Sequence, residues 1–188
     1  MNENITWPSW PNLGPVEEKA VMEVVKSNQL FAAEKVAAFE KAFAEYVGVE
    51  YVKGVGNATE GLHLALAALG VGVGDEVIVP TYTWISSASC ILMQNAVPVF
   101  ADSSKDTLAL SANTIRPLIT NKTKAIIVVH LFGYPADMDP ILALAKEKSI
   151  PVIEDASHVH GATYKGRKCG SMGKIGVFSL HQRKSLPV

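Results

Sequence analysis

The chain has 188 residues, 48% of them hydrophobic, and its 17 Lys and Arg residues against 18 Asp and Glu residues give a formal net charge of -1. This length suits about one domain with a sizeable core, and the composition excludes a disordered or collagen-like chain. Near-neutral charge without a basic run leaves no electrostatic footprint for nucleic acid or for an anionic membrane surface, which favours a small-molecule partner.

Two helices are predicted in the first 47 residues. After a Trp- and Pro-rich opening (Trp7, Pro8, Trp10, Pro11), Pro15 stands where a helix can begin, and valines at 21, 24 and 25 follow at helical spacing. A second helix is expected between residues 33 and 47, where apolar residues lie three to four apart before Gly48. We therefore treat residues 1–32 as an N-terminal segment with the first helix, and 33–188 as the main unit.

Short β-branched runs then alternate with helical stretches. The predicted strands are residues 51–55, 76–79, 97–101, 125–130 and 151–155, and the predicted helices are about 59–69, 84–94 and 139–148. Such alternation predicts an α/β fold, in which a mostly parallel sheet is covered by helices on both faces as a three-layer sandwich. Ligands of such sheets bind outside the carboxyl ends of the strands.

A small-residue turn follows the first predicted strand and leads from Gly54 through Gly56 to Thr59 and Glu60. A helix that begins here can bind a phosphate, because its unpaired N–H groups and its positive dipole end point at the anion. Two alternatives are a plain Gly-rich connection and a dinucleotide-binding turn. The dinucleotide fingerprint fails at its last glycine, where Thr59 stands.

Trp84 and Asp155 lie just after, or at the end of, predicted strands. The Trp84 ring can stack on a flat cofactor, and the alternative is a large core or helix-start residue. A carboxylate that leaves a buried strand requires a cationic partner such as a protonated ring nitrogen, and the alternative is that Asp155 caps the next segment or pairs with a lysine. His130, His158 and His160 invite a metal site with Asp155, but no further His or Cys spacing supports one.

The chain closes with repeated glycines, a short apolar run that could form another strand, Ser179 and Lys184. A lysine in a desolvated site has a lowered pKa and can form a Schiff base with a carbonyl, whereas one in a basic Arg-Lys pair is usually a surface residue. Pyridoxal phosphate (PLP) requires a phosphate site, an aromatic ring, a carboxylate and such a lysine together. The four features therefore favour a PLP site.

These motifs resemble the DegT/DnrJ/EryC1/StrS aminotransferases, sugar aminotransferases of PLP fold type I. The resemblance covers nearly the whole chain and is most specific in Glu154-Asp155-Ala156, His160-Gly161-Ala162, Tyr164-Lys165-Gly166, Phe178-Ser179 and Lys184. It implies the PLP-binding large domain of the aspartate aminotransferase-like fold. Lys184 would be the Schiff-base lysine and the acid/base of the proton shift, and Asp155 would pair with the pyridine nitrogen.

The resemblance assigns the remaining cofactor contacts as well. Trp84 would stack on the ring, Thr59 and Glu60 would offer N–H groups to the phosphate, and Ser179 would add a hydroxyl. His158 stands where the family usually has a Gln that bonds the phenolic oxygen, and histidine can also donate there. Ala58 stands where the family commonly has Gly.

By resemblance, the reaction is amination of a keto group on a nucleotide-linked deoxysugar, with glutamate or glutamine as the amino donor. One alternative is a keto-cyclitol substrate, and another is a non-catalytic sensor of the same fold. The presence of Lys184 argues against the sensor. It also argues against a dehydratase of this family, which typically has His in place of that lysine. Family members are roughly twice as long. We therefore expect a truncated large domain without the C-terminal small domain, inactive alone, and a homodimer at full length.

A cytoplasmic location is expected. The apolar stretches are far shorter than the roughly 20 residues that cross a bilayer. Residues 1–4 lack a basic region followed by an apolar one, so they do not resemble a secretory signal. Cys90 and Cys169 cannot form a multi-bridge disulfide framework.

Overall fold

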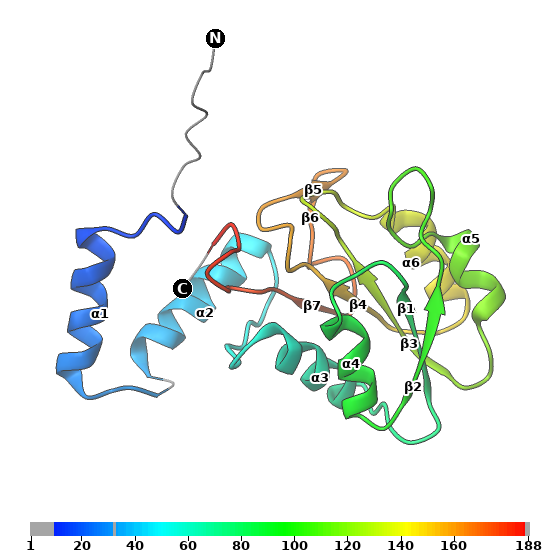
Figure 1. Cartoon of the computed structure of the whole chain (residues 1–188), viewed down its shortest axis with the longest axis horizontal. Helices are drawn as coiled ribbons and strands as arrows, with labels where there is room; N and C mark the ends of the chain where they lie inside the picture. Colours follow the sequence, from blue (N-terminus) through cyan, green and yellow to red (C-terminus); the bar gives the residue numbers. More distant parts are fainter. Residues whose placement is uncertain (1–9, 32, 187–188) are drawn as a thin grey trace, which may run out of the picture.

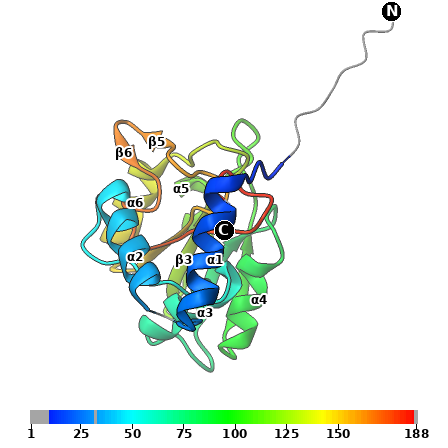
Figure 2. The ribbon, with the colours of Figure 1, turned by 90° about the vertical axis from the view of Figure 1, so that its left-hand side faces the viewer.

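The computed structural model describes residues 10–31 and 33–186; Trp7, Pro8 and the boundary at residue 32 lie outside them. The two predicted N-terminal helices are confirmed as α1 (Pro15–Ser27) and α2 (Glu34–Val47). Helix α1 buries none of its residues, whereas α2 buries Phe43, Ala44 and Val47. Figure 1 shows α1 apart from the sheet, and Figure 2, turned by 90°, shows it in front of the rest of the chain.

The sheet has five strands, all parallel, in the order β2-β1-β3-β4-β7. The strands are β1 (Glu76–Pro80), β2 (Val97–Ala101), β3 (Thr123–Val129), β4 (Val152–Asp155) and β7 (Ile175–Val177). A small antiparallel hairpin, β5 (Thr163–Tyr164) with β6 (Arg167–Lys168), stands outside it. The α/β class is confirmed, and four of the five predicted strands lie within two residues of their predicted bounds.

Helices cover both faces of the sheet (Figure 1). One face carries α3 (Ala58–Ala68) and α4 (Ser86–Met93); the other carries α5 (Ala112–Ile115), the short 3-10 helix η1 (Arg116–Leu118) and α6 (Met138–Glu147). Side chains alternate along the strands, so that Ile127 packs towards α3 and α4 while Ile126 and Val128 pack towards α6. The expected three-layer sandwich is therefore present.

The predicted strand at 51–55 is wrong. These residues form an extended loop beside α2, where Gly54 N–H donates to Glu40 Oε1 at 2.8 Å and Lys53 pairs with the same carboxylate at 3.0 Å. The loop's polar contacts go to a helix and not to a strand. β-branched residues indicate a strand only where a neighbouring strand accepts their backbone groups.

Strand β7 lies at an edge of the sheet within the described residues. A Cβ at Gly176 would overlap the Gly170 carbonyl, so only glycine allows the preceding loop to pass this close. Val177 on the same strand packs closely against α3, where a Cβ added at Gly61 would lie 3.0 Å from Val177 Cγ1. The strand is three residues long and ends at Val177. The predicted extra strand is therefore present, but it lies nearer the N terminus than expected from the apolar run that extends to Leu180.

Candidate active site

The carboxyl ends of the five parallel strands lie along one edge of the sheet, and the loops that follow them meet there. The loop after β1 carries Tyr82 and the loop after β3 carries Phe132, and their ring centroids lie 6.3 Å apart. Strand β1 has β2 on one side and β3 on the other, so the connections leave in opposite directions at this point. Such a switch point is where sheets of this class bind ligands.

Asp155 ends β4 and is 5% exposed. Its Oδ2 accepts a hydrogen bond from the Ser87 hydroxyl at 2.8 Å, and its Oδ1 accepts from the Ser157 N–H at 3.2 Å. Both oxygens are therefore oriented by the protein. The bond from Ser157 caps the segment that follows β4, so the capping alternative describes Oδ1, whereas the described contacts include no ion pair of Asp155 with a lysine.

Lys184 lies half-buried beside a cavity of about 240 Å³ that is also lined by Phe132, Ser157, His158 and Arg183. Burial lowers the pKa of the Lys184 amine below its usual 10.5, and the charge of Asp155 opposes this only in part. The neutral amine, which is the nucleophile, is therefore more populated than on an exposed lysine. The structure thus favours the site interpretation of Lys184 over a solvated surface residue.

His158 stacks on Phe132, with ring centroids 5.9 Å apart and an interplanar angle of 24°. The Phe132 N–H donates to His158 Nδ1 at 3.5 Å, so in the neutral ring Nε2 carries the proton and can donate it. Burial, followed by the charge of Lys184, lowers the pKa of His158 below 6.5. Phe132 itself has a left-handed backbone (φ 52°), an uncommon conformation for an aromatic residue.

Thr59 and Glu60 lie in the first turn of α3, as the predicted phosphate turn requires. The Glu60 N–H donates to Asn57 Oδ1 at 3.0 Å, so Asn57 caps the helix and already uses that donor. The Thr59 hydroxyl lies 2.7 Å from Ser86 Oγ. Among the two predicted N–H donors, Thr59 is therefore the one left available to an anion.

Trp84 and Ser179 differ in exposure. Trp84 is 72% exposed, which rules out the core alternative, and its carbonyl accepts from the Ser87 N–H at 3.1 Å just before α4, so the helix-start alternative stays open. Ser179 follows β7, is buried, and accepts a long hydrogen bond from the His181 N–H at 3.4 Å. Both lie after strand ends, on the edge where Asp155 and Lys184 are found.

A second buried carboxylate, Glu154, supports the site from the other face of β4. It accepts hydrogen bonds from the N–H groups of Gly170 (2.8 Å), Met172 (2.6 Å) and Gly173 (2.5 Å) and from His130 Nε2 (2.9 Å). The Ala136 N–H donates to His130 Nδ1 at 3.0 Å, so Nε2 carries the proton. His130 thus joins a structural pair, and no group of three or more His, Cys, Asp or Glu side chains in residues 10–31 and 33–186 is placed to hold a metal ion.

Sequence reasoning missed three contacts of the site. Ser86 and Ser87 bond Thr59 and Asp155, and the indole Nε1 of Trp10 donates to the Lys184 carbonyl at 3.2 Å. The two serines carry no specific signal in the sequence, because serine is suited equally to a helix start, a turn or a surface. Nothing in the sequence relates Trp10 to a residue 174 positions away.

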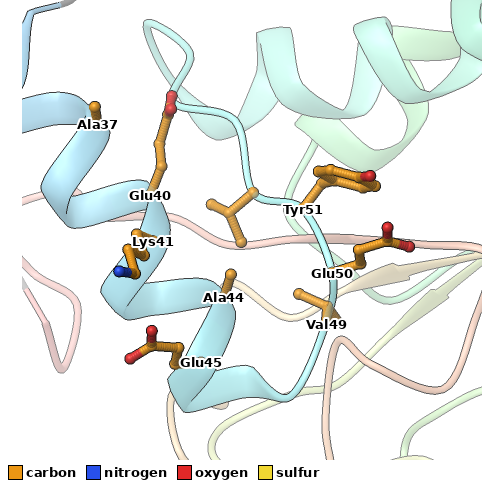
Figure 3. Close-up of a pocket in the computed structure, with 9 residues that line it drawn as sticks. Ala37, Glu40, Lys41, Ala44, Glu45, Val49, Glu50 and Tyr51 are labelled. Atoms are coloured by element: carbon orange, nitrogen blue, oxygen red, sulfur yellow. The ribbon is translucent and has the colours of Figure 1, made fainter.

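A larger hollow, of about 380 Å³, lies elsewhere, between α2 and the loop at 49–52 (Figure 3). Its lining includes Glu40, Lys41, Glu45, Glu50 and Tyr51, and none of the predicted site residues. We take the smaller cavity as the candidate active site, because Lys184 and His158 line it together with Ser157, whose N–H donates to Asp155.

The reactivity of Lys184 gives a test of its environment. At about pH 9, an amine-reactive reagent is expected to label Lys184 faster than Lys165, because only the deprotonated amine reacts. Lys165 is the internal control, since its hydrogen bond to Asp139 at 2.7 Å raises its pKa. Peptide mapping by mass spectrometry over time measures both rates, and equal rates would contradict the assignment.

The sequence profile of the DegT/DnrJ/EryC1/StrS aminotransferase family matches residues 11–188. The chain belongs to this family. It is 42% identical over 187 residues to the L-glutamine:2-deoxy-scyllo-inosose aminotransferase of Streptomyces fradiae, with 96% of this chain and 44% of that protein covered.

Solved structures of the same family superpose closely on this chain. The aminotransferase from Psychrobacter cryohalolentis superposes with a TM-score of 0.93 at 42% identity, over 97% of this chain and 47% of that one. A Streptococcus pneumoniae protein described as a sugar aminotransferase, solved in a PLP form, superposes with a TM-score of 0.93 at 31% identity. The match covers 97% of this chain and 51% of that one. PLP is the cofactor of this family. The chain spans about half the length of these relatives, and none of its described helices is long and apolar enough to span a membrane.

Proposed function

We propose that residues 33–188 form the N-terminal part of the PLP-binding domain of an aminotransferase that acts on a ketone of a polyhydroxylated ring. The observation that carries this proposal is the pairing of two groups at one sheet edge. Asp155 is a buried carboxylate with both oxygens oriented, and Lys184 is an amine with a lowered pKa at the adjacent cavity. A pyridinium nitrogen needs such a carboxylate, and an aldehyde needs such an amine.

The other donors of the site also fit PLP. Thr59 at the start of α3 and the Ser179 hydroxyl suit a phosphate, which is favoured at the positive end of a helix. The exposed Trp84 ring at the same edge offers an aromatic face for stacking. When bound, PLP supplies an electron sink for the carbanion next to the reacting nitrogen.

The chain's own residues divide the remaining work. Lys184, with its lowered pKa, removes a proton from one carbon and returns it to another. Asp155 keeps a proton on the ring nitrogen by its negative charge. His158 donates from Nε2 to an oxygen anion, and the Phe132 ring stacked on it fixes the plane of the imidazole.

We propose a keto-cyclitol as the substrate and glutamine as the amino donor. The proposal is supported by two relatives, 42% and 43% identical, both named L-glutamine:2-deoxy-scyllo-inosose aminotransferase. A nucleotide-linked keto-deoxysugar is the second candidate, favoured by the structural neighbour described as a sugar aminotransferase. Both substrates present a ketone on a hydroxyl-rich ring, so the chemistry at Lys184 is the same.

The test is a substrate panel with the full-length protein. PLP is added first and its binding is followed by visible absorbance; 2-deoxy-scyllo-inosose and a nucleotide-linked keto-deoxysugar are then each offered with glutamine and with glutamate. Turnover of the cyclitol with glutamine is expected. Turnover of the nucleotide sugar alone would replace the first candidate by the second, and PLP binding without turnover of any ketone would favour a non-catalytic sensor.

Asp155→Asn is expected to lower kcat by roughly 10²–10⁴-fold, since loss of one partner of a buried ion pair costs about 3–5 kcal/mol. Asparagine has nearly the same shape and keeps an acceptor for Ser87 but carries no charge for the ring nitrogen. The measurement is steady-state kcat with the preferred ketone. Asp102→Asn, at an exposed position after β2, is the matched control and should leave kcat unchanged. An Asp155→Asn enzyme with near-normal kcat would contradict the assignment.

A further inference from the structure

Two consecutive serines in the first turn of α4 reach towards different parts of the site. Ser86 Oγ lies 2.7 Å from the hydroxyl of Thr59, at the start of α3, and Ser87 Oγ donates to Asp155 Oδ2 at 2.8 Å. Neighbouring residues on a helix point about 100° apart, so one turn of helix can contact two separate neighbours. Through these two bonds α4 joins elements that lie 27 residues and 68 residues away in the sequence.

The direction of the hydrogen bonds at Ser87 is fixed by its single proton. Because Ser87 gives that proton to Asp155, its oxygen must accept from Thr83, whose Oγ1 lies 2.9 Å away. The chain of donors therefore runs from Thr83 through Ser87 to Asp155. The Ser157 N–H fixes the other carboxylate oxygen, so Asp155 cannot rotate without loss of one bond.

Burial makes the Ser87 bond costly to lose. Ser87 is 0% exposed, and its neighbours Ala88, Cys90 and Ile91 are buried too. Without the hydroxyl, Asp155 Oδ2 would lack this donor in an apolar environment, where an unpaired polar group is destabilising. Ser86 is half-buried, so the loss of its bond to Thr59 should have a smaller effect.

Resting on the proposed function, we propose that Ser86 and Ser87 are positioning residues that set the phosphate end and the ring-nitrogen end of the cofactor site relative to one another. Ser86 acts on the phosphate end through Thr59, and Ser87 acts on the ring end through Asp155. Neither needs to touch the cofactor. The spacing between the two ends is then determined by one rigid helical turn.

Two probes separate the two ends: PLP and pyridoxal, which has the same ring and aldehyde but no phosphate. In the full-length protein, Ser87→Ala is expected to raise the dissociation constants of both about tenfold. Ser86→Ala is expected to raise that of PLP about threefold and to leave that of pyridoxal unchanged. Ser87→Thr keeps the hydroxyl and should recover most of the affinity.

Ser89→Ala is the matched control, because Ser89 lies on the same helix and its hydroxyl bonds neither Thr59 nor Asp155. Both dissociation constants should equal those of the unaltered protein. Should Ser87→Ala lose its fold, as thermal unfolding of the cofactor-free protein would reveal, Thr83→Val interrupts the same donor chain from its less buried end. A smaller loss of affinity for both probes is expected.

The outcomes separate the two proposals. If the unaltered protein binds neither PLP nor pyridoxal, the proposed function fails, and the roles of the serines fail with it. If it binds both, and Ser86→Ala and Ser87→Ala behave like Ser89→Ala, only the positioning inference is overturned. An equal loss of PLP and pyridoxal affinity in Ser86→Ala would overturn the assignment of Ser86 to the phosphate end.

Discussion

Replacing Lys184 by alanine is expected to lower kcat of the full-length protein by at least about 10³-fold. The amine has two tasks in the proposed reaction: it bonds the cofactor aldehyde, and it carries the proton between two carbons. Alanine performs neither, and the nearby His158 is held by its stack on Phe132. The measurement is kcat with glutamine and the preferred ketone, together with the visible spectrum of bound PLP.

Lys122→Ala is the control for this change, because Lys122 is exposed and precedes β3 at the opposite edge of the sheet. It should leave both kcat and the spectrum unchanged. A small primary amine added to Lys184→Ala should restore part of the rate, since it supplies the missing proton acceptor. Retention of more than roughly a tenth of the original kcat by Lys184→Ala would refute its catalytic role.

Removing the Glu154 carboxylate is expected to lower the free energy of unfolding by about 3–5 kcal/mol. Glu154 is 0% exposed and accepts four hydrogen bonds, three of them from N–H groups of the loop at 170–173. Glu154→Ala leaves those donors without an acceptor in the interior. Urea unfolding of the cofactor-free protein measures the effect. Glu147→Ala, which removes an exposed carboxylate paired with Arg116, is the control and should change little.

The contribution of Glu154 to the free energy of unfolding should also depend on pH. Burial raises the pKa of Glu154, but the hydrogen bond from His130 and those from Gly173 and Gly170 outweigh it, so the pKa is below its usual 4.5. The stabilisation is therefore complete above that value and is lost as the pH falls through the lower pKa of the folded protein. Glu154→Gln should lose this part of the acid dependence. If the stability of Glu154→Gln falls at low pH as much as that of the unaltered protein, Glu154 does not contribute to this acid dependence.

The sheet was largely predictable from sequence because its central strands β1, β3 and β4 are mostly buried. Residues 125–130 read as a nearly continuous apolar run, and β3 occupies Thr123–Val129. The segment at 51–55 also contains β-branched valines, but its Gly54 N–H donates to Glu40 on α2. Whether a β-branched run finds a strand beside it depends on tertiary contacts that no local pattern contains.

The position of Asp155 could be predicted from the sequence, because the residue stands at the end of a predicted strand; its role in the site stays a prediction. Asp155 is the last residue of β4, and its type and place together indicated a ligand. Ser87 was not predictable in this way, because a serine is suited equally to a helix start, a turn or a surface. Its role depends on a hydroxyl lying 2.8 Å from a carboxylate 68 residues away.

Glu154 and Asp155 are neighbours in β4, yet they point to opposite faces of the sheet. The Glu154 carboxylate accepts hydrogen bonds from the loop at 170–173. The Asp155 carboxylate faces α4 and the proposed cofactor site. A slip of one residue in the pairing of β4 with β3 would exchange them. An insertion or deletion inside this strand would thus displace the carboxylate proposed for the cofactor and the carboxylate that holds the loop at 170–173 in a single step.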